Sequence, residues 1–283
     1  MWGTPAQAAI SVKDDTGWAL TLERPARRIV CLYGAFSELL LAMGLDRHLV
    51  GRTAADGHIP ALQALPAVGT HMRPNAELIV ALRPDVVIQL VGRKEAESIS
   101  LELRRLGVPV LMFRMDSFEN MFAVLQRLGV ITGEEGRAAG LEKLYRTRLA
   151  NVRAALTGAA QAKVFYEVRY PNLLGAGVDS IVNDILLHAG ARNALATAGK
   201  VVRINEEELI RLNPDAYLIQ QGPMNPAPSP LDSRAHYATL DVVRTGRVLV
   251  VEEAAFARPG PRAVDAVEQL ARWLHPDIHI SQQ

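Results

Sequence analysis

Two segments of this chain follow the same plan, and a repeat of this kind restricts the fold more than any other feature of the sequence. The first segment runs from Glu77 to Ile88 and the second from Glu207 to Ile219. In each, a glutamate starts a short amphipathic helix, the sequence Leu-x-Pro-Asp ends that helix, and a hydrophobic strand follows. The proline accounts for the end of the helix, because it excludes the preceding residue from the helical region of φ and ψ. Two such copies, about 130 residues apart, predict a chain built from two related halves.

A long amphipathic segment separates the two copies. Between Thr132 and Thr157, apolar side chains recur at spacings of three and four, which places them on one face of a helix. These residues are Leu141, Leu144, Tyr145, Leu149, Val152, Ala155 and Leu156. Acidic residues gather near the start of the segment and basic residues near its end, as the helix dipole favours. We therefore predict a single helix of about 24 residues, roughly 36 Å long.

Short apolar strands alternate with helical patterns in both halves, which is typical of βαβ units and of a mainly parallel sheet. The predicted strands are 29–33, 49–53, 86–91, 110–114, 163–168, 216–221 and 248–251. The predicted helices, besides the long one, are 37–43, 76–82, 95–106, 180–188 and 262–274. The predicted fold is therefore α/β, with two Rossmann-like lobes and mainly parallel sheets, joined by one long backbone helix. The expected boundaries are 10–131 for the N-terminal lobe, 132–158 for the bridging helix and 159–283 for the C-terminal lobe.

Charge and hydropathy argue against two classes of protein. Lysine and arginine number 31 against 30 acidic residues, so the formal net charge is only +1, whereas a nucleic-acid binder usually carries a strong basic excess. The sequence has no run of about 18 uncharged apolar residues and therefore predicts no transmembrane helix. Residues Met1–Thr4 do not begin a basic region followed by an apolar one, so we expect a signal peptide to be absent or already removed from this chain.

The sequence offers no coherent catalytic site. It contains no P-loop, no Gly-x-Ser-x-Gly nucleophile elbow and no His-Glu-x-x-His metal motif. The segment Gly175-Ala176-Gly177 lacks the third glycine of a dinucleotide fingerprint. The one cysteine, Cys31, excludes an internal disulfide and lies in an apolar strand, where we interpret it as a small buried hydrophobic residue. We therefore expect a protein that is not an enzyme and that has no intrinsic cofactor.

Several short motifs, in order along the chain, resemble those of one family. They are Pro25–Val30, Ser37–Leu45, Leu65–Gly69, Asn75–Glu77 with Leu82–Asp85, Asn183-Asp184 with Ala189-Gly190, and Pro259–Arg262. From about Ile10 to Pro276 the chain resembles the cluster-A, class III periplasmic binding proteins, which carry ferric siderophores, haem or cobalamin for ABC importers. The resemblance implies an extracytoplasmic transport protein, periplasmic or lipid-anchored, that acts as a monomer.

The resemblance also implies how such a protein works. In this family two α/β lobes are bridged by one rigid helix, and the ligand binds between the lobes at the carboxyl ends of the strands. One glutamate from each lobe docks on arginines of the two permease subunits, and the matching positions here are Glu77 and Glu207. Glu208 competes for the second role, and an acid at a helix start is also favoured by the helix dipole alone.

The loops that follow the predicted strands hold the candidate ligand-binding residues. These are Tyr33, His58, His71, Arg73, Arg93, Arg114, Tyr170 and Arg258. The set is rich in arginine, tyrosine and histidine, and guanidinium groups bind carboxylate or phosphate-like groups in a bidentate manner. We therefore expect an anionic small-molecule ligand, either a metal chelate (a ferric siderophore, haem or cobalamin) or a metal oxyanion.

The sequence leaves the choice among these ligands open. Tyr33 and His71 could ligate the metal if the ligand is haem or a bare metal complex. Haem-binding members often carry a ligating tyrosine in the segment that corresponds to 69–73, where this chain has Thr70-His71 instead. The loops also contain few aromatic residues, whereas a large macrocycle usually stacks on several. A molybdate- or tungstate-binding protein of the same fold is the alternative, and a cytoplasmic, chelatase-type two-lobed enzyme is the alternative from another class.

Overall fold

A computed structural model describes residues 9–92 and 94–279. These residues fall into two compact units. The first unit is built by the chain up to Met115 together with Glu119–Lys143, and the second by Asp116–Phe118 together with the chain from Leu144 onward. The chain passes from the first unit to the second inside one long helix.

The first unit begins with an antiparallel hairpin of two short strands and continues with a four-stranded parallel sheet and its helices. Its strands are β1 (Ile10–Lys13), β2 (Ala19–Leu22), β3 (Ile29–Cys31), β4 (Leu49–Gly51), β5 (Val86–Leu90) and β6 (Val110–Phe113). Its helices are α1 (Gly34–Ala42), α2 (Ala76–Ala81), α3 (Lys94–Arg105), nearly all of α4 (Phe118–Thr132) and the first part of α5 (Glu135–Ala155). Short 3-10 helices occur at η1 (Asp46–His48), η2 (Ala54–His58) and η3 (Pro60–Leu62).

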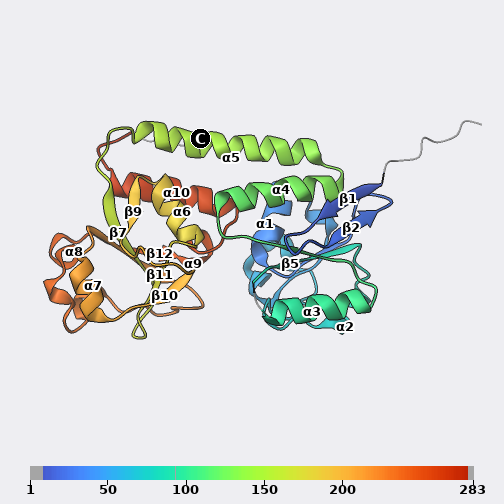
Figure 1. Ribbon diagram of the computed structural model, residues 1–283, viewed down its shortest axis with the longest axis horizontal. Helices are drawn as coiled ribbons and strands as arrows, with labels where there is room; N and C mark the ends of the chain where they lie inside the picture. Colours follow the sequence, from blue (N-terminus) through green and yellow to red (C-terminus); the bar gives the residue numbers. More distant parts are fainter. Residues whose placement is uncertain (1–8, 93, 280–283) are drawn as a thin grey trace, which may run out of the picture. The chain divides into compact units, whose positions relative to one another are not determined.

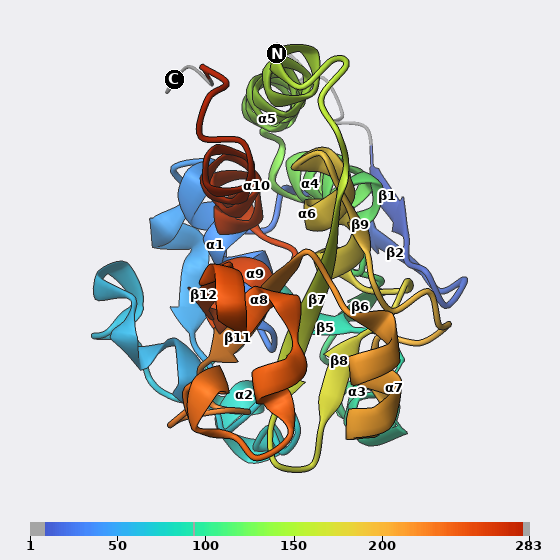
Figure 2. The ribbon, with the colours of Figure 1, turned by 90° about the vertical axis from the view of Figure 1, so that its left-hand side faces the viewer.

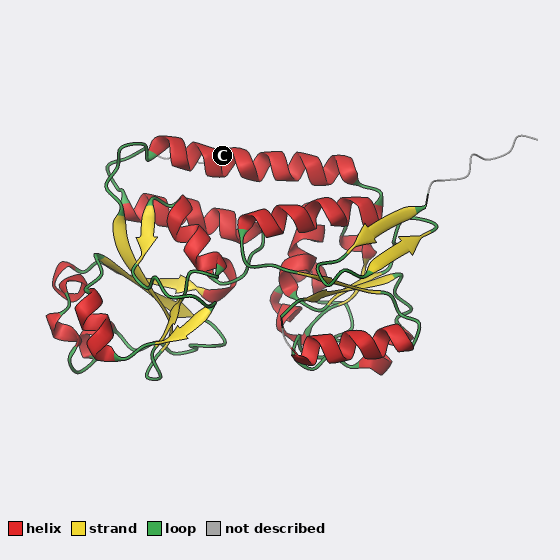
Figure 3. Ribbon diagram, viewed as in Figure 1, coloured by secondary structure: helices red, strands yellow, loops and turns green. Residues whose placement is uncertain are grey.

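The strands of the first sheet run in the order β4-β3-β5-β6. On one face, α2 and α3 bury Ile79 and Leu103 against Val30 and Val87 of the sheet. Helices α1 and α4 cover the opposite face (Figures 1 and 3). Strand β3, which comes first in the chain, lies between β4 and β5, which come second and third. The chain therefore leads from β3 to a neighbour on one side and later to a neighbour on its other side.

The second unit contains one mixed sheet with helices on both faces. Its strands are β7 (Ala162–Arg169), β8 (Leu174–Ala176), β9 (Ala191–Asn193), β10 (Val201–Arg203), β11 (Ala216–Gln221) and β12 (Val248–Glu252). Its helices are the rest of α5, α6 (Ile181–His188), α7 (Glu206–Leu212), α8 (Asp241–Thr245), α9 (Glu253–Phe256) and α10 (Pro261–Leu274). The 3-10 helices η4 (Leu231–Ser233) and η5 (Tyr237–Thr239) lie between β11 and α8.

The parallel part of the second sheet repeats the topology of the first. Strands β9, β7, β11 and β12 are paired in parallel in that order, with the first strand again between the second and the third (Figure 2). The two sequence copies thus build two related α/β units with mainly parallel sheets, and the predicted fold class is confirmed. The residue pattern did not predict the parallel strand β9. It also did not predict β8 and β10, which add an antiparallel edge beside the end of β7. It also missed the β1–β2 hairpin.

Both copies of the Pro-Asp motif end their helix in the same way. Arg83 and Asn213, which precede the two prolines, have left-handed φ angles of +46° and +36°. At α7 the backbone N–H of Asn213 still donates to the carbonyl of Leu209, so this residue closes the helix before the chain turns away. The proline therefore stops each helix as predicted, because it excludes the preceding residue from the right-handed helical region.

The two aspartates of the motif hold the first strand of each sheet. One carboxylate oxygen of Asp85 accepts hydrogen bonds from the backbone N–H groups of Arg27 (2.7 Å) and Arg28 (2.9 Å), just before β3. A carboxylate oxygen of Asp215 accepts from the N–H of Lys163 in β7 at 2.7 Å. In return, the backbone N–H of each aspartate donates to the carbonyl of Arg28 or Lys163, both at 2.7 Å. Each motif thus fixes the start of the third strand against the start of the first strand.

The long amphipathic segment forms α5, which has 21 residues and begins three residues later than predicted, at Glu135 instead of Thr132. The preceding residues belong to α4, which the sequence analysis missed and which ends where Gly133 adopts a φ of +69°. Tyr145 and Val152 are buried as expected, but Leu144 is 47% exposed because it lies about 100° around the helix from Tyr145. Within the described part of the chain, no helix is both long and apolar enough to cross a membrane.

The aspartate clamp can be tested by stability measurements. We expect Asp85→Ala to lower the free energy of unfolding by about 1–2 kcal/mol, because two backbone N–H groups lose a charged acceptor. Asp215→Ala should cost about half as much, since its carboxylate accepts one such bond in β7. Urea denaturation provides the measurement, and Asp232→Ala at an exposed position is the matched control. If Asp85→Ala and the control had the same midpoint and slope, the clamp would not stabilise the sheet.

The environment of Cys31 also leads to a prediction. The side chain is fully buried in β3, as the sequence analysis proposed. Burial raises the pKa of its thiol far above the ordinary value, which suppresses the reactive thiolate. We expect the native protein to resist thiol labelling by DTNB at about pH 8 and the urea-unfolded protein to react fully. Fast stoichiometric labelling in native buffer would contradict the buried position.

Candidate functional site

The order of the strands marks one place in each sheet where side chains can converge on a ligand. Ligands of open α/β sheets bind outside the carboxyl ends of the strands, at the point where neighbouring connections leave in opposite directions. In the first unit this point follows β3, and in the second it follows β7. Tyr33 lies two residues after β3 and Tyr170 directly follows β7. The two predicted tyrosines therefore lie at the switch points of their own sheets.

In the first unit the structure brings Tyr33 and His71 together. Tyr33 is half-buried at the start of α1, and its ring lies edge-on to that of Phe36 with 5.9 Å between the ring centres. The His71 ring lies 6.3 Å from the Tyr33 ring, centre to centre. His71 belongs to a tight loop that begins at Gly69, with a φ of +98°, and that also carries the exposed Arg73. A phenol, an imidazole and a guanidinium thus come from two adjacent strand-end segments.

The structure places the remaining candidates of the first unit in other surroundings. His58 is exposed at the end of η2, and its Nδ1 lies 2.8 Å from the carbonyl oxygen of Ala55. Arg114 is exposed directly after β6, and its backbone N–H donates to the carboxylate of Asp15 at 2.6 Å. Arg93 lies outside the described residues. His58 therefore contacts the backbone of its own turn. Arg114 is held through its backbone N–H, and its side chain is exposed.

In the second unit Tyr170 rests on a buried ion pair that the sequence analysis missed. The guanidinium carbon of Arg234 lies 4.1 Å from the centre of the Tyr170 ring. Its nitrogens donate to the two carboxylate oxygens of Glu167 at 2.5 Å and 3.0 Å, and the Tyr217 hydroxyl donates to the same carboxylate at 2.6 Å. The side chains of Arg234 and Glu167 are 1% and 0% exposed. The sequence signal is the acid inside the apolar strand β7, since a buried charge requires a partner.

The hydroxyl of Tyr170 has its own partner. It donates to the carboxylate of Glu206, the first residue of α7, at 3.4 Å. Burial, together with the nearby Glu206 carboxylate, raises the pKa of Tyr170 above its ordinary value. The shift moves the pKa further from neutral pH, so the hydroxyl of Tyr170 acts as a hydrogen-bond donor to Glu206.

A second network holds the loops that follow β11 and β12. The hydroxyl of the buried Tyr166 donates to Gln220 Oε1 at 3.1 Å, and Gln220 Nε2 donates to the Glu253 carboxylate at 2.9 Å. The same carboxylate accepts the backbone N–H of Met224, in the loop after β11, at 2.9 Å. Arg258 is half-buried two residues beyond α9, in the segment that leads into α10. Buried polar side chains therefore anchor the second-unit loops that follow the strand ends.

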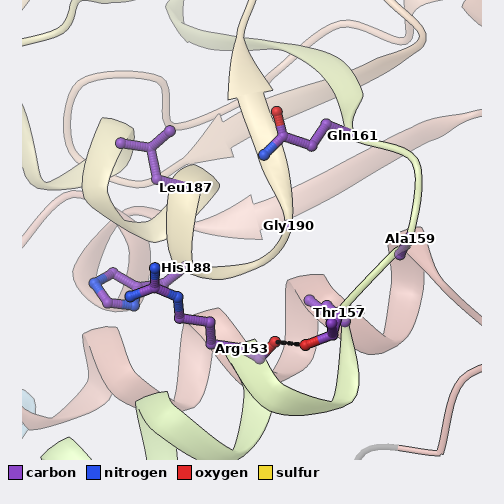
Figure 4. Close-up of a pocket in the computed structure, with 8 residues that line it drawn as sticks. Arg153, Thr157, Ala159, Gln161, Leu187, His188 and Gly190 are labelled. Carbon is purple, nitrogen blue, oxygen red and sulfur yellow. Dashed lines mark hydrogen bonds between the residues drawn. The ribbon is translucent and has the colours of Figure 1, made fainter.

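A pocket of about 450 Å³ in the second unit lies away from the predicted residues (Figure 4). It is lined by Arg153, Leu156, Thr157, Ala159, Gln161, Leu187, His188 and Gly190. Ala159 and Gln161 precede β7, so this pocket lies at the amino end of the strand whose carboxyl end leads to Tyr170. Since ligands of open α/β sheets bind at the carboxyl ends, we do not assign the transported ligand to this pocket.

The candidate docking acids occupy matching positions on their helices. Asn75 caps α2 and Asn205 caps α7, each by accepting the backbone N–H of the third residue after it, at 3.0 Å and 2.8 Å. Glu77 and Glu207 each follow their cap by two residues and are exposed in the first turn. The register of the caps therefore makes Glu207, rather than Glu208, the counterpart of Glu77.

Comparison with known proteins identifies related sequences and structures. A family described as "Periplasmic binding protein" matches residues 29–255. An uncharacterized ABC transporter substrate-binding lipoprotein, YvrC of Bacillus subtilis, is 27% identical over 274 residues, which cover 95% of this chain and 86% of the relative. The vitamin B12-binding protein of Salmonella paratyphi A is 25% identical over 250 residues, covering 88% and 90%. Among solved structures, a periplasmic heme binding protein from Pseudomonas aeruginosa has 28% identity and a TM-score of 0.78, covering 91% of this chain and 96% of that one.

These comparisons agree with the fold and with the lack of catalytic motifs. The family match spans well over half of the 283 residues. The relatives are substrate-binding transport proteins rather than enzymes, which leaves no support for the chelatase-type alternative. The chain belongs to the periplasmic binding protein family and is the extracytoplasmic substrate-binding protein of an ABC importer, which delivers its ligand to a membrane permease.

Proposed function

We propose that this protein captures an anionic metal chelate at the carboxyl ends of its parallel strands and carries it to a dimeric permease. The observation that carries the proposal is the pairing of Tyr33 with His71 at the switch point of the first sheet. A phenol and an imidazole are ligands for iron in a porphyrin. The exposed guanidinium of Arg73, in the same loop as His71, suits the carboxylate groups that such chelates carry.

The names of the relatives support a chelate over a bare ion. One is described as a vitamin B12-binding protein and another as a periplasmic heme binding protein, and both ligands are large organic metal complexes. In each unit a tyrosine after the first strand, Tyr33 or Tyr170, offers aromatic surface to a ligand of this kind. Arg258 of the second unit offers a positive charge. Haem, cobalamin and ferric siderophores are the members of the proposed class, and a molybdate or tungstate oxyanion is the alternative that the test must separate from it.

Direct binding measurements test the ligand class. The purified protein is titrated with haemin, cyanocobalamin, ferric citrate and molybdate, with tryptophan fluorescence and native mass spectrometry as readouts. We expect saturable one-to-one binding of at least one chelate. Binding of molybdate without any chelate would overturn the proposal and favour the oxyanion alternative.

Arg258 provides a prediction for the ligand contact itself. We expect Arg258→Ala to weaken binding of the chelate at least tenfold, about 1.4 kcal/mol, because a charge-assisted contact is lost. Arg244→Ala is the matched control, since Arg244 is an exposed arginine of the same unit that pairs with Asp241 on α8. Isothermal titration calorimetry gives both dissociation constants. Equal affinities for the two variants would remove Arg258 from the site.

We also propose that Glu77 and Glu207 dock the protein on the permease, one acid for each permease subunit. The two acids share the same helical position and the same cap, so two related surfaces are available to a two-fold symmetric partner. In this proposal one monomer of the binding protein, periplasmic or lipid-anchored, serves one permease dimer. Size-exclusion chromatography with light scattering and fractionation of intact cells test these two points.

Uptake measurements test the docking acids. The double variant Glu77→Ala/Glu207→Ala should abolish transport into proteoliposomes that contain the permease, while the chelate affinity of the free protein stays unchanged. Glu208→Ala is the matched control, because this acid is adjacent in sequence but lies one helical position further on. Transport by the double variant at the rate of the control would refute the assignment.

A further inference from the structure

The most unusual feature beyond the proposed contacts is the buried ion pair of Glu167 and Arg234 in the second unit. Arg234 donates to both carboxylate oxygens of Glu167 and to the backbone carbonyl of Ser229 at 2.7 Å. The Tyr217 hydroxyl supplies a further bond to Glu167, at 2.6 Å. The pair is therefore held in a single geometry by neighbours on β7, β11 and the loop after β11.

Packing alone does not explain such a pair. Burying two charges costs desolvation energy that their attraction offsets only with good geometry, and apolar side chains of similar volume often stabilise a fold equally well. The surrounding cluster is otherwise apolar and aromatic, with Phe165, Leu231 and Tyr237 among its members. We therefore look for a function of the Glu167–Arg234 pair that apolar side chains could not provide.

The position of the guanidinium suggests that role. It lies 4.1 Å from the centre of the Tyr170 ring and 5.4 Å from that of Tyr237. Tyr237 also packs edge-on to Tyr170, with 5.9 Å between the ring centres and 69° between the ring planes. The Tyr170 hydroxyl is held separately by Glu206 at 3.4 Å. Three contacts thus fix one face, one edge and the hydroxyl of a tyrosine that remains half-buried at the end of β7.

We infer that Arg234 is a positioning residue for Tyr170, and that the buried ion pair prepares this ring to receive an anionic ligand. A guanidinium against one face of a ring draws the negative potential of the π-system towards itself. The part of the ring that stays exposed then repels an anionic or electron-rich ligand less than an unpolarised tyrosine does. This inference rests on the proposed function, in which Tyr170 faces the chelate.

The test removes the two charges together, so that no uncompensated charge is left in the core. The variant Glu167→Gln/Arg234→Met keeps an acceptor for Tyr217 and similar side-chain volumes. The matched control is Arg148→Met/Glu268→Gln, which removes another ion pair of the second unit, with Arg148 Nε 2.8 Å from Glu268 Oε1 between α5 and α10. Thermal unfolding followed by circular dichroism establishes that both variants are folded.

A readout without ligand separates this inference from the proposed function. NMR spectra of protein with ¹³C-labelled tyrosine rings report on Tyr170, whose signals are assigned with Tyr170→Phe. We expect the Tyr170 ring signals to move towards the values of a mobile ring in the Glu167/Arg234 variant and to stay in place in the Arg148/Glu268 control. Unchanged Tyr170 signals in the first variant would overturn the positioning role, whichever ligand the protein binds.

A double-mutant cycle then tests the effect on binding, with the chelate that the wild type binds among haemin, cyanocobalamin and ferric citrate. We expect the Glu167/Arg234 variant to weaken binding about fivefold and to have no further effect in a Tyr170→Leu background. An equal loss in both backgrounds would overturn the inference, because the pair would then act through the fold and not through Tyr170. If the wild type bound none of the chelates while the NMR result held, the proposed function would fail and the positioning of the ring would stand.

Discussion

In each of the two α/β sheets, one carboxylate joins the end of a helix to the start of the first strand, and the strand ends that form the candidate site depend on it. Asp85 and Asp215 each follow a proline that ends a helix, and each binds backbone N–H groups at the beginning of β3 or β7. These bonds set the register between the first and third strands, which are direct neighbours in both sheets. Because the register fixes where the strands end, it also fixes where Tyr33 and Tyr170 emerge.

This dependence explains how much of the fold could be predicted from the sequence. Prolines and apolar runs act locally, so the repeat, α5 and the parallel strands except the three-residue β9 were predicted to within a few residues. Helix α4 was missed because no element was predicted for the apolar stretch from Phe118 to Ile131, and the long helix was taken to begin at Thr132. The strands β8 and β10 have three residues each, and their pairing depends on the partner strand rather than on their own sequence.

The site was less predictable, because its residues act through contacts between segments distant in sequence. The sequence was sufficient to place Tyr33, His71 and Tyr170 in loops that follow strands, and a parallel sheet brings its strand ends to one edge. The contact of Tyr170 with Arg234 could not be predicted, because Arg234 lies in a proline-rich connector where no periodicity indicates which way a side chain points. The acid Glu167 within the apolar strand β7 indicates that a cation is buried nearby, but the sequence does not show which of several arginines supplies it.

The two units repeat a topology without repeating the chemistry of their strand ends. Glu77 and Glu207 keep the same distance from the capping asparagine and from the proline, so the proposed docking acids occupy equivalent positions in the two units. The switch points differ, with an imidazole beside the tyrosine of the first sheet and a buried guanidinium beneath the tyrosine of the second. The two units therefore share the capped helix that carries Glu77 or Glu207, while the contacts at the ends of their first strands differ.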